Sequence, residues 1–198
     1  GKKILISGGG RCNFTNLNVT AETFLSANRH FCRSALARYT QWDFISLVER
    51  YGIAYHEKEL GQLFCNQSAR QIVKLLTDEC NEAGVRIATD YSVNGVERGA
   101  NGFVVKTNRG AIDAASLVVA CGGLSVPKMG ATAFGYELAK KFGHSVVPTR
   151  AALVPLVFSA DDLVRYKDLS GVSLPVQVEC GRQSFSNAML FTHRGISG

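Results

Sequence analysis

The residues with the clearest capacity for chemistry lie in one glycine-rich stretch near the start of the chain. Residues 7–16 read SGGGRCNFTN. Glycine allows backbone N–H groups to approach a ligand that a Cβ would keep away, and convergent N–H groups suit an anion. Arg11, Asn13 and Thr15 add polar donors beside them. The stretch predicts a loop that binds a phosphate or pyrophosphate, although a polar glycine turn without any ligand has the same spacing.

Two common phosphate-binding motifs do not match this stretch. The P-loop requires a lysine and a hydroxyl residue after its last glycine, whereas Gly10 is followed by Arg-Cys-Asn. The Rossmann fingerprint G-x-G-x-x-G lies between a strand and a helix, but here the glycines lead into loop-forming residues. A nucleotide triphosphatase is therefore disfavoured.

Helical patterns around the loop indicate the elements that position it. The short apolar run Ile4-Leu5-Ile6 predicts a brief strand or turn that leads into the glycines. Apolar spacing and capping residues predict helices over residues 22–28, 31–39 and 41–51, from Ser68 to Gly84, and over 134–142. In this prediction Thr40 caps the third helix and Gly52 ends it.

Strand patterns complete the expected α/β fold. Short strands are predicted over residues 54–57, 62–65 and 144–147. From residue 85 to 120 the apolar period becomes two, which indicates an antiparallel β meander. Residues 116–120, SLVVA, form a continuous apolar run and predict a strand buried in a parallel core sheet. The chain from residue 151 onward is expected to be β-rich.

Composition and charge limit the function classes. No apolar run is long enough to span a bilayer or act as a signal sequence, so we expect a soluble, cytoplasmic protein. Six scattered cysteines without a C-x-x-C pair predict reduced thiols and no metal site. The net charge of +6 suits an anionic partner. Because the basic residues are spread singly, nucleic acid is disfavoured.

Cysteine and histidine side chains are two further candidates for chemistry. Cys12 has no partner cysteine within three residues, which disfavours disulfide-reductase chemistry and favours a packed loop residue. His193 and Arg194 could reach a substrate, but a structural turn is the favoured interpretation. No catalytic residue is assigned.

Three segments together resemble a known family. KKILISGGGRCNFTN, LVVACGGLSVP and FTHRGISG are similar, in order and spacing, to the NAD(P)/FAD-dependent oxidoreductases of the YhiN and BaiN type. The resemblance covers essentially the whole chain. It implies a partial FAD-binding domain, Rossmann-like and of the glutathione-reductase type, over residues 1–150. Residues 151–198 would begin an inserted β-rich domain.

The resemblance also implies which residues approach the cofactor. In the glycine stretch these are Ser7, Gly8, Gly9, Gly10, Arg11, Cys12, Asn13 and Thr15. Val93 would touch the adenine through its backbone. Ala120, Cys121, Gly122 and Gly123 match a family A-T-G-G turn near the pyrophosphate. Cys121 replaces the usual threonine, which weakens the hydrogen bond that a hydroxyl could make.

The implied activity is that of a flavoprotein reductase. FAD would pass hydride from NAD(P)H to a small organic acceptor, one class being an enone C=C bond. The family's N-terminal G-x-G-x-x-G and C-terminal G-E-x-x-D segments are absent from these 198 residues. We therefore expect a fragment that is inactive by itself and binds FAD weakly or not at all. The oligomeric state stays open.

The alternative function is a nucleotide- or nucleic-acid-binding module without redox chemistry. The two differ in a simple observable. A flavoprotein purifies yellow, whereas an RNA-binding module carries ultraviolet absorbance of nucleic acid that salt removes.

Overall fold

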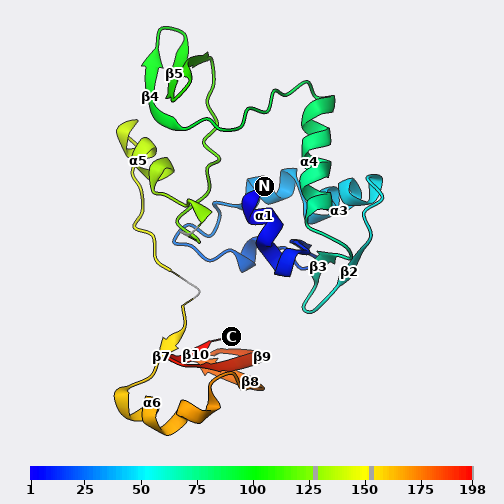
Figure 1. Cartoon of the computed structure of the whole chain (residues 1–198), viewed down its shortest axis with the longest axis vertical. Coiled ribbons are helices and arrows are strands. Elements are labelled where there is room, and N and C mark those ends of the chain that lie inside the picture. Colours follow the sequence, from blue (N-terminus) through cyan, green and yellow to red (C-terminus); the bar gives the residue numbers. More distant parts are fainter. Residues whose placement is uncertain (127–128, 152–153, 198) are drawn as a thin grey trace. The chain divides into compact units, whose positions relative to one another are not determined.

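The chain forms two structural units, Gly1–His144 and Ser145–Gly198. The computed structural model describes residues 1–126, 129–151 and 154–197, and Figure 1 shows its helices and strands. Every strand pair in these ranges is antiparallel, so the chain combines helices with three antiparallel sheets. None of the helices within them has the length and apolarity needed to cross a bilayer.

A small three-stranded sheet and three helices form the core of the first unit. The strands β1 (Asn13–Asn16), β3 (Gln62–Cys65) and β2 (Tyr55–Glu57) lie in the order β1-β3-β2. The helices α1 (Lys2–Ile6), α3 (Gln41–Arg50) and α4 (Arg70–Glu82) supply the rest. The core cluster consists of Cys12, Val48, Ile53, Cys65, Ala69, Ile72 and Leu75.

Local sequence signals explain the two longest helices. The Thr40 hydroxyl accepts a hydrogen bond from the Asp43 amide at 3.3 Å, and the Asp43 carboxylate accepts from the Thr40 amide at 2.6 Å. This reciprocal capping box satisfies amides that have no partner inside α3. At the start of α4 the Ser68 hydroxyl accepts from the Arg70 amide at 3.2 Å. Gly52 and Gly84 follow the two helices with positive φ, which confirms both predicted helices and their ends.

The predicted meander is confirmed, and one helix is attached to it. It consists of β4 (Val93–Gly99), β5 (Gly102–Thr107) and β6 (Gly110–Ala114), paired in that order. The predicted helix over 134–142 is α5 (Phe134–Lys141). The Lys141 ammonium donates to the Val96 carbonyl at 2.8 Å, which ties the end of α5 to β4. Residues 85–89, expected to start the meander, form no strand.

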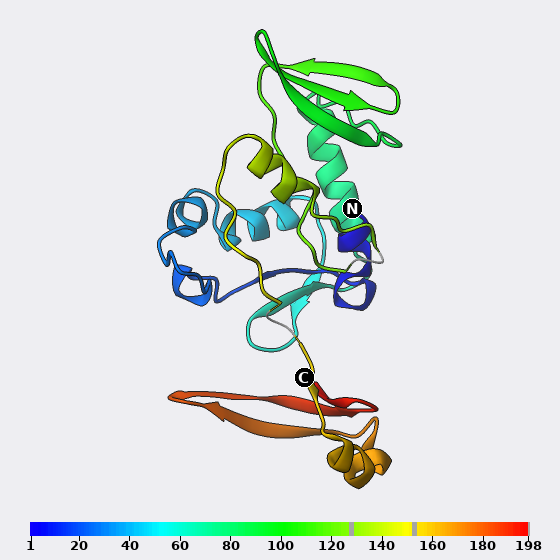
Figure 2. The ribbon, with the colours of Figure 1, turned by 90° about the vertical axis from the view of Figure 1, so that its left-hand side faces the viewer.

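The second unit is a four-stranded sheet with one short helix. Its strands β7 (Leu156–Val157), β8 (Ser173–Cys180), β9 (Gln183–Thr192) and β10 (Gly195–Ser197) lie in the order β7-β10-β9-β8. Figure 2 shows the long paired strands β8 and β9 from a second side. The predicted β-rich character is confirmed. The helix α6 (Ala160–Tyr166), followed by the 3-10 turn η4 (Lys167–Leu169), was not predicted. Ser159 caps α6, since its hydroxyl accepts from the Asp162 amide at 3.2 Å.

The first apolar run is helical, so the brief strand or turn predicted over Ile4-Leu5-Ile6 is wrong. These residues belong to α1, where the Leu5 amide donates to the Gly1 carbonyl at 3.0 Å. Ile4 packs against the core cluster, and a Cβ on Gly1 would lie 3.0 Å from Val73 of α4. Three apolar residues are too few to distinguish a helical pattern from a strand pattern, so packing against α4 determines the conformation of this run.

The helices predicted over 22–28 and 31–39 are shorter than expected. Only η2 (Ala21–Thr23), a 3-10 turn, and α2 (Arg33–Arg38) form. Neither contains a buried residue, so no apolar face stabilises a longer helix.

The buried parallel strand predicted over residues 116–120 is also wrong. This segment pairs with no described strand, and Val118 is 85% exposed. Leu117 and Val119 face a hollow formed with α5 and β5. An apolar run becomes a buried strand only where neighbouring strands accept its hydrogen bonds. The short strand predicted over 144–147 is wrong as well, because these described residues form no strand.

The same leucine-to-alanine substitution should have very different effects on stability inside and outside the core. Leu75 is 1% exposed and Leu25 is 93% exposed. Leu75→Ala should lower the free energy of unfolding by about 2 to 5 kcal/mol, because it leaves a cavity between α4 and the sheet. Leu25→Ala should change it by less than about 0.5 kcal/mol. Urea denaturation measures both, and equal effects would contradict this description of the core.

Candidate functional site

The glycine loop has a backbone that other residues rarely adopt. It forms the 3-10 turn η1 (Ser7–Gly10), in which Gly8, Gly9 and Gly10 have φ of +56°, +64° and +84°. Cys12 follows at +54°. Such values are unfavourable for residues with a Cβ, so three successive glycines meet a conformational requirement. A loop of this kind presents its backbone without side-chain cover.

Hydrogen bonds hold the loop against the core. The Gly10 carbonyl accepts from the Ala69 amide at 2.7 Å, and the Arg11 carbonyl accepts from the Cys65 amide at 3.0 Å. The Ser7 hydroxyl donates to the Ile4 carbonyl at 2.8 Å. The loop is therefore attached to α1, to β3 and to the residue before α4.

The glycines differ in what surrounds them. A Cβ on Gly8 would lie 2.5 Å from Cε1 of Phe64 and 2.9 Å from the Asn13 amide nitrogen. A Cβ on Gly9 would meet no heavy atom of the described residues within 4 Å. Gly8 is thus required by packing, while Gly9 faces open space that a ligand can enter.

An apolar hollow of about 290 Å³ adjoins the loop. Cys12, Asn13 and Phe14 line it together with Ile72 of α4. Lys3 and Ser7 also line it and bring a cation and a hydroxyl. The hollow and the open glycine backbone lie on adjoining surfaces, a combination that suits a ligand with both apolar and anionic parts.

The second predicted segment, residues 120–123, lies at the start of α5. A Cβ on Gly135 would be 3.3 Å from the Cys121 sulfur, and one on Gly123 would be 3.2 Å from the Tyr136 hydroxyl. All four residues of the segment are exposed. The Lys3 ammonium donates to the Ser125 hydroxyl, so this stretch is connected to α1 and thereby to the glycine loop.

Other predicted residues lie apart from this arrangement. Val93 is the first residue of β4 and pairs with Thr107, in a different sheet from the loop. Thr15 pairs with Leu63 across β1 and β3. Arg194 lies in the turn between β9 and β10, where its amide donates to the Thr192 hydroxyl at 3.2 Å, consistent with a structural turn.

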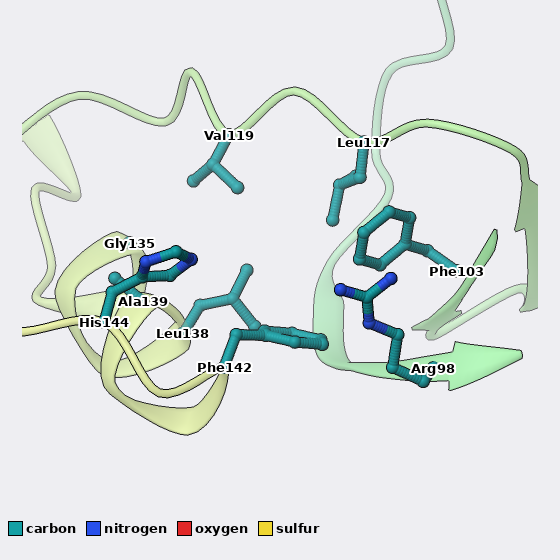
Figure 3. Close-up of a pocket in the computed structure, with 9 residues that line it drawn as sticks. All are labelled: Arg98, Phe103, Leu117, Val119, Gly135, Leu138, Ala139, Phe142 and His144. Carbon is teal, nitrogen blue, oxygen red and sulfur yellow. The ribbon is translucent and has the colours of Figure 1, made fainter.

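A second hollow, shown in Figure 3, contains none of the predicted site residues. It measures about 240 Å³ and lies between α5, β4, β5 and residues 117–119. The Arg98 guanidinium lies 4.9 Å from the Phe103 ring centre and 5.7 Å from that of Phe142. Leu117 and Val119 point into the same space. It is a packing hollow between the meander and α5.

Sequence reasoning missed that Cys12 and Cys65 share one buried environment. They are 4% and 0% exposed and belong to the same cluster. Burial, with the neighbouring Cys12 thiol as a smaller cause, raises the pKa of Cys65 to about 11. The residues are far apart in sequence, and the contact of the glycine loop with β3, in which the Arg11 carbonyl accepts from the Cys65 amide, brings them together. Among the described residues, no group of three or more His, Cys, Asp or Glu side chains could hold a metal ion.

The residues present fit a dinucleotide cofactor at the loop. The Gly9 backbone is open, and the exposed Arg11 lies beside it. Lys3 lines the adjoining hollow and contacts the 120–125 stretch. A pyrophosphate needs close backbone approach and nearby positive charge, and both are available here.

This α/β chain, with its open glycine loop, belongs to the HI0933-like protein Rossmann domain family, which matches residues 1–197. The fold class expected from the sequence is thereby confirmed at the level of a Rossmann-like, mixed α/β chain.

Curated relatives match along the whole chain. It is 54% identical to a ribosomal RNA dihydrouridine synthase of Haemophilus influenzae and 50% identical to the protein of the same name from Escherichia coli. It is 29% identical to a 3-dehydro-bile acid delta(4,6)-reductase of Clostridium scindens. Each match covers 100% of this chain, which spans about half the length of these relatives.

The buried Cys65 thiol predicts a loss of stability in alkali. Because its pKa is raised from 9.0 to about 11, the unfolded chain releases this proton before the folded protein does. Its stabilising contribution is complete below pH 9 and declines by about 1.4 kcal/mol per pH unit as pH rises towards 11. Urea denaturation across this range should show a steeper decline for the native sequence than for Cys65→Ala. Parallel declines would contradict the assignment.

Proposed function

We propose that the whole protein containing this chain is a cytoplasmic, FAD-dependent reductase of a C=C bond conjugated to a carbonyl group. NAD(P)H would supply the hydride, and the acceptor would be a uridine of ribosomal RNA. The observation that carries the proposal is the 54% and 50% identity, over all of this chain, to two proteins named ribosomal RNA dihydrouridine synthase.

The printed names of the relatives share one type of chemistry. Conversion of uridine to dihydrouridine saturates the C5=C6 bond, which is conjugated to the C4 carbonyl. The name of the more distant relative specifies reduction of double bonds in a 3-dehydro-bile acid. In both cases hydride is added to a conjugated C=C bond, and a proton completes the saturated product. Reduced FAD, when bound, supplies such a hydride.

The described residues contribute binding and orientation to this reaction. The open backbone at Gly9 and the adjacent Arg11 would hold the anionic part of FAD. The attachment of the loop to Ala69 and Cys65 would keep that position fixed during turnover. The stretch near Ser125, linked to Lys3, would lie along the same cofactor. No described residue is assigned as the proton donor.

An RNA acceptor departs from the sequence-based expectation of a small-molecule substrate. That expectation rested on the family resemblance, and nucleic acid was disfavoured because the sequence has no dense basic run. A protein that recognises a single exposed base needs few phosphate contacts, because stacking and hydrogen bonds to the base supply part of the affinity. The net charge of +6 is compatible with such a substrate.

The direct test is reduction of ribosomal RNA by the purified whole protein. RNA from cells that lack the protein would be incubated with it and either NADPH or NADH. Nucleoside mass spectrometry should detect dihydrouridine, and the flavin absorbance of the protein should bleach on addition of the preferred donor. Colourless protein that retains RNA until salt removes it would instead support the binding module without redox chemistry.

A matched glycine pair tests whether the loop holds the cofactor. Gly9 and Gly52 both have φ of +64° and no heavy atom of the described residues within 4 Å of an added Cβ. Gly9→Ala and Gly52→Ala should therefore lower stability by a similar amount, about 1 to 2 kcal/mol. Only Gly9→Ala should also weaken FAD binding, by about tenfold or more, because its methyl group occupies the ligand side of the loop. Flavin titration of the apoprotein measures this, and equal affinities would remove the loop from the cofactor site.

A further inference from the structure

One face of the β1-β3-β2 sheet carries a row of side chains that lie outside the core cluster. Leu63 and Cys65 of β3 are buried, and side chains alternate between the two faces of a strand. Phe64 therefore points to the opposite face. In the strand register it lies directly across from Asn13 of β1 and from His56 of β2. Asn13 and His56 are exposed, and Phe64 is half-buried.

The two rings of this row are stacked, and a cation lies beside them. The ring centres of His56 and Phe64 are 6.2 Å apart with an interplanar angle of 22°. The ammonium of the exposed Lys58 lies 6.0 Å from the Phe64 ring centre. Nδ1 of His56 lies 2.7 Å from the Asn66 side-chain oxygen, which fixes the ring orientation. We call the set Asn13, His56, Lys58 and Phe64 the sheet platform.

The sheet platform adjoins the glycine loop. The Phe64 ring occupies the space that a Cβ on Gly8 would need. A planar group stacked on the platform would thus lie beside the loop that the proposed function assigns to FAD. Glu57, the acidic neighbour of His56 in β2, points away by strand alternation, and its carboxylate accepts from the Gly61 amide at 3.0 Å.

We propose that the sheet platform binds an unpaired base of single-stranded RNA, with Lys58 meeting the neighbouring phosphate. Single-stranded RNA is recognised by aromatic side chains that stack on bases and by cations that follow the backbone. The platform supplies both on one small surface, and Asn13 adds an amide suited to hydrogen bonds with a base edge. The identity of the RNA rests on the proposed function, but the binding surface rests on the contacts of these residues.

The test compares binding of two labelled RNAs to the whole protein by fluorescence anisotropy. One is a short single-stranded uridine oligoribonucleotide, and the other is the same strand without its bases. Phe64→Leu keeps an apolar side chain against Gly8 but removes the stacking surface. It should weaken binding of the uridine strand about tenfold and leave binding of the abasic strand unchanged. Phe185→Leu, at a phenylalanine that is 64% exposed in β9, is the matched control and should bind both strands normally.

The cation is tested by a second matched pair. Lys58→Gln should weaken binding of both strands and reduce the slope of log affinity against log salt by about 0.7, as expected for one lost phosphate contact on a single strand. Lys140→Gln, at an exposed lysine of α5, should leave the slope unchanged. His56→Leu repeats the stacking test at an exposed position if Phe64→Leu fails to fold.

The outcomes separate this inference from the proposed function. Normal uridine reduction by the native protein, combined with equal RNA binding by Phe64→Leu and Phe185→Leu, would overturn the platform alone. Loss of flavin from both Phe64→Leu and His56→Leu would also overturn it, because the surface would then belong to the cofactor. Absence of both RNA binding and uridine reduction in the native protein would overturn the platform and the proposed function together.

Discussion

The backbone of the glycine loop can reach its conformation only where successive residues lack a Cβ. At Gly8 the reason is packing, because the Phe64 ring fills the position that a side chain would take. At Gly9 the reason is conformational strain alone, since the space around it is open. One stretch thus combines a contact with Phe64, which fixes the loop to β3, with an open side at Gly9 that is available to a ligand. The proposed cofactor site and the sheet platform both depend on this arrangement.

The same use of glycine recurs where residues 120–123 meet α5. Gly135 allows the Cys121 sulfur to approach the helix, and Gly123 lies against the Tyr136 hydroxyl. At its other end α5 is bound to β4 through Lys141. The helix therefore connects the meander to a predicted cofactor segment, although neither of them contributes to the main core cluster. In both the glycine loop and residues 120–123, glycine allows neighbouring segments to come close to each other, which positions the two parts of the candidate site.

Local signals determined which parts of this fold could be predicted. The Thr40 capping box and the apolar face of α4 act within a few residues, so the sequence alone indicates those helices. The helical state of Ile4 and the unpaired state of residues 116–120 depend on what lies across from them, which no local pattern records. The juxtaposition of Phe64 with Gly8 depends likewise on the register of β1 and β3. The glycine loop could therefore be predicted from the sequence as a motif, whereas the residues that pack against it could not.

In the proposed function, holding the cofactor and recognising the acceptor would be tasks of different residues. Under that proposal, hydride transfer to a conjugated C=C bond would need the same cofactor position whether the acceptor is a nucleobase or a bile acid, so the glycine loop would serve both. Recognition of the acceptor needs a surface that differs between them. On this chain the stacked His56 and Phe64 rings adjoin the loop without forming part of it. A substrate preference can therefore change through exposed residues of the sheet while the loop backbone, constrained by Gly8 and its contacts, remains the same.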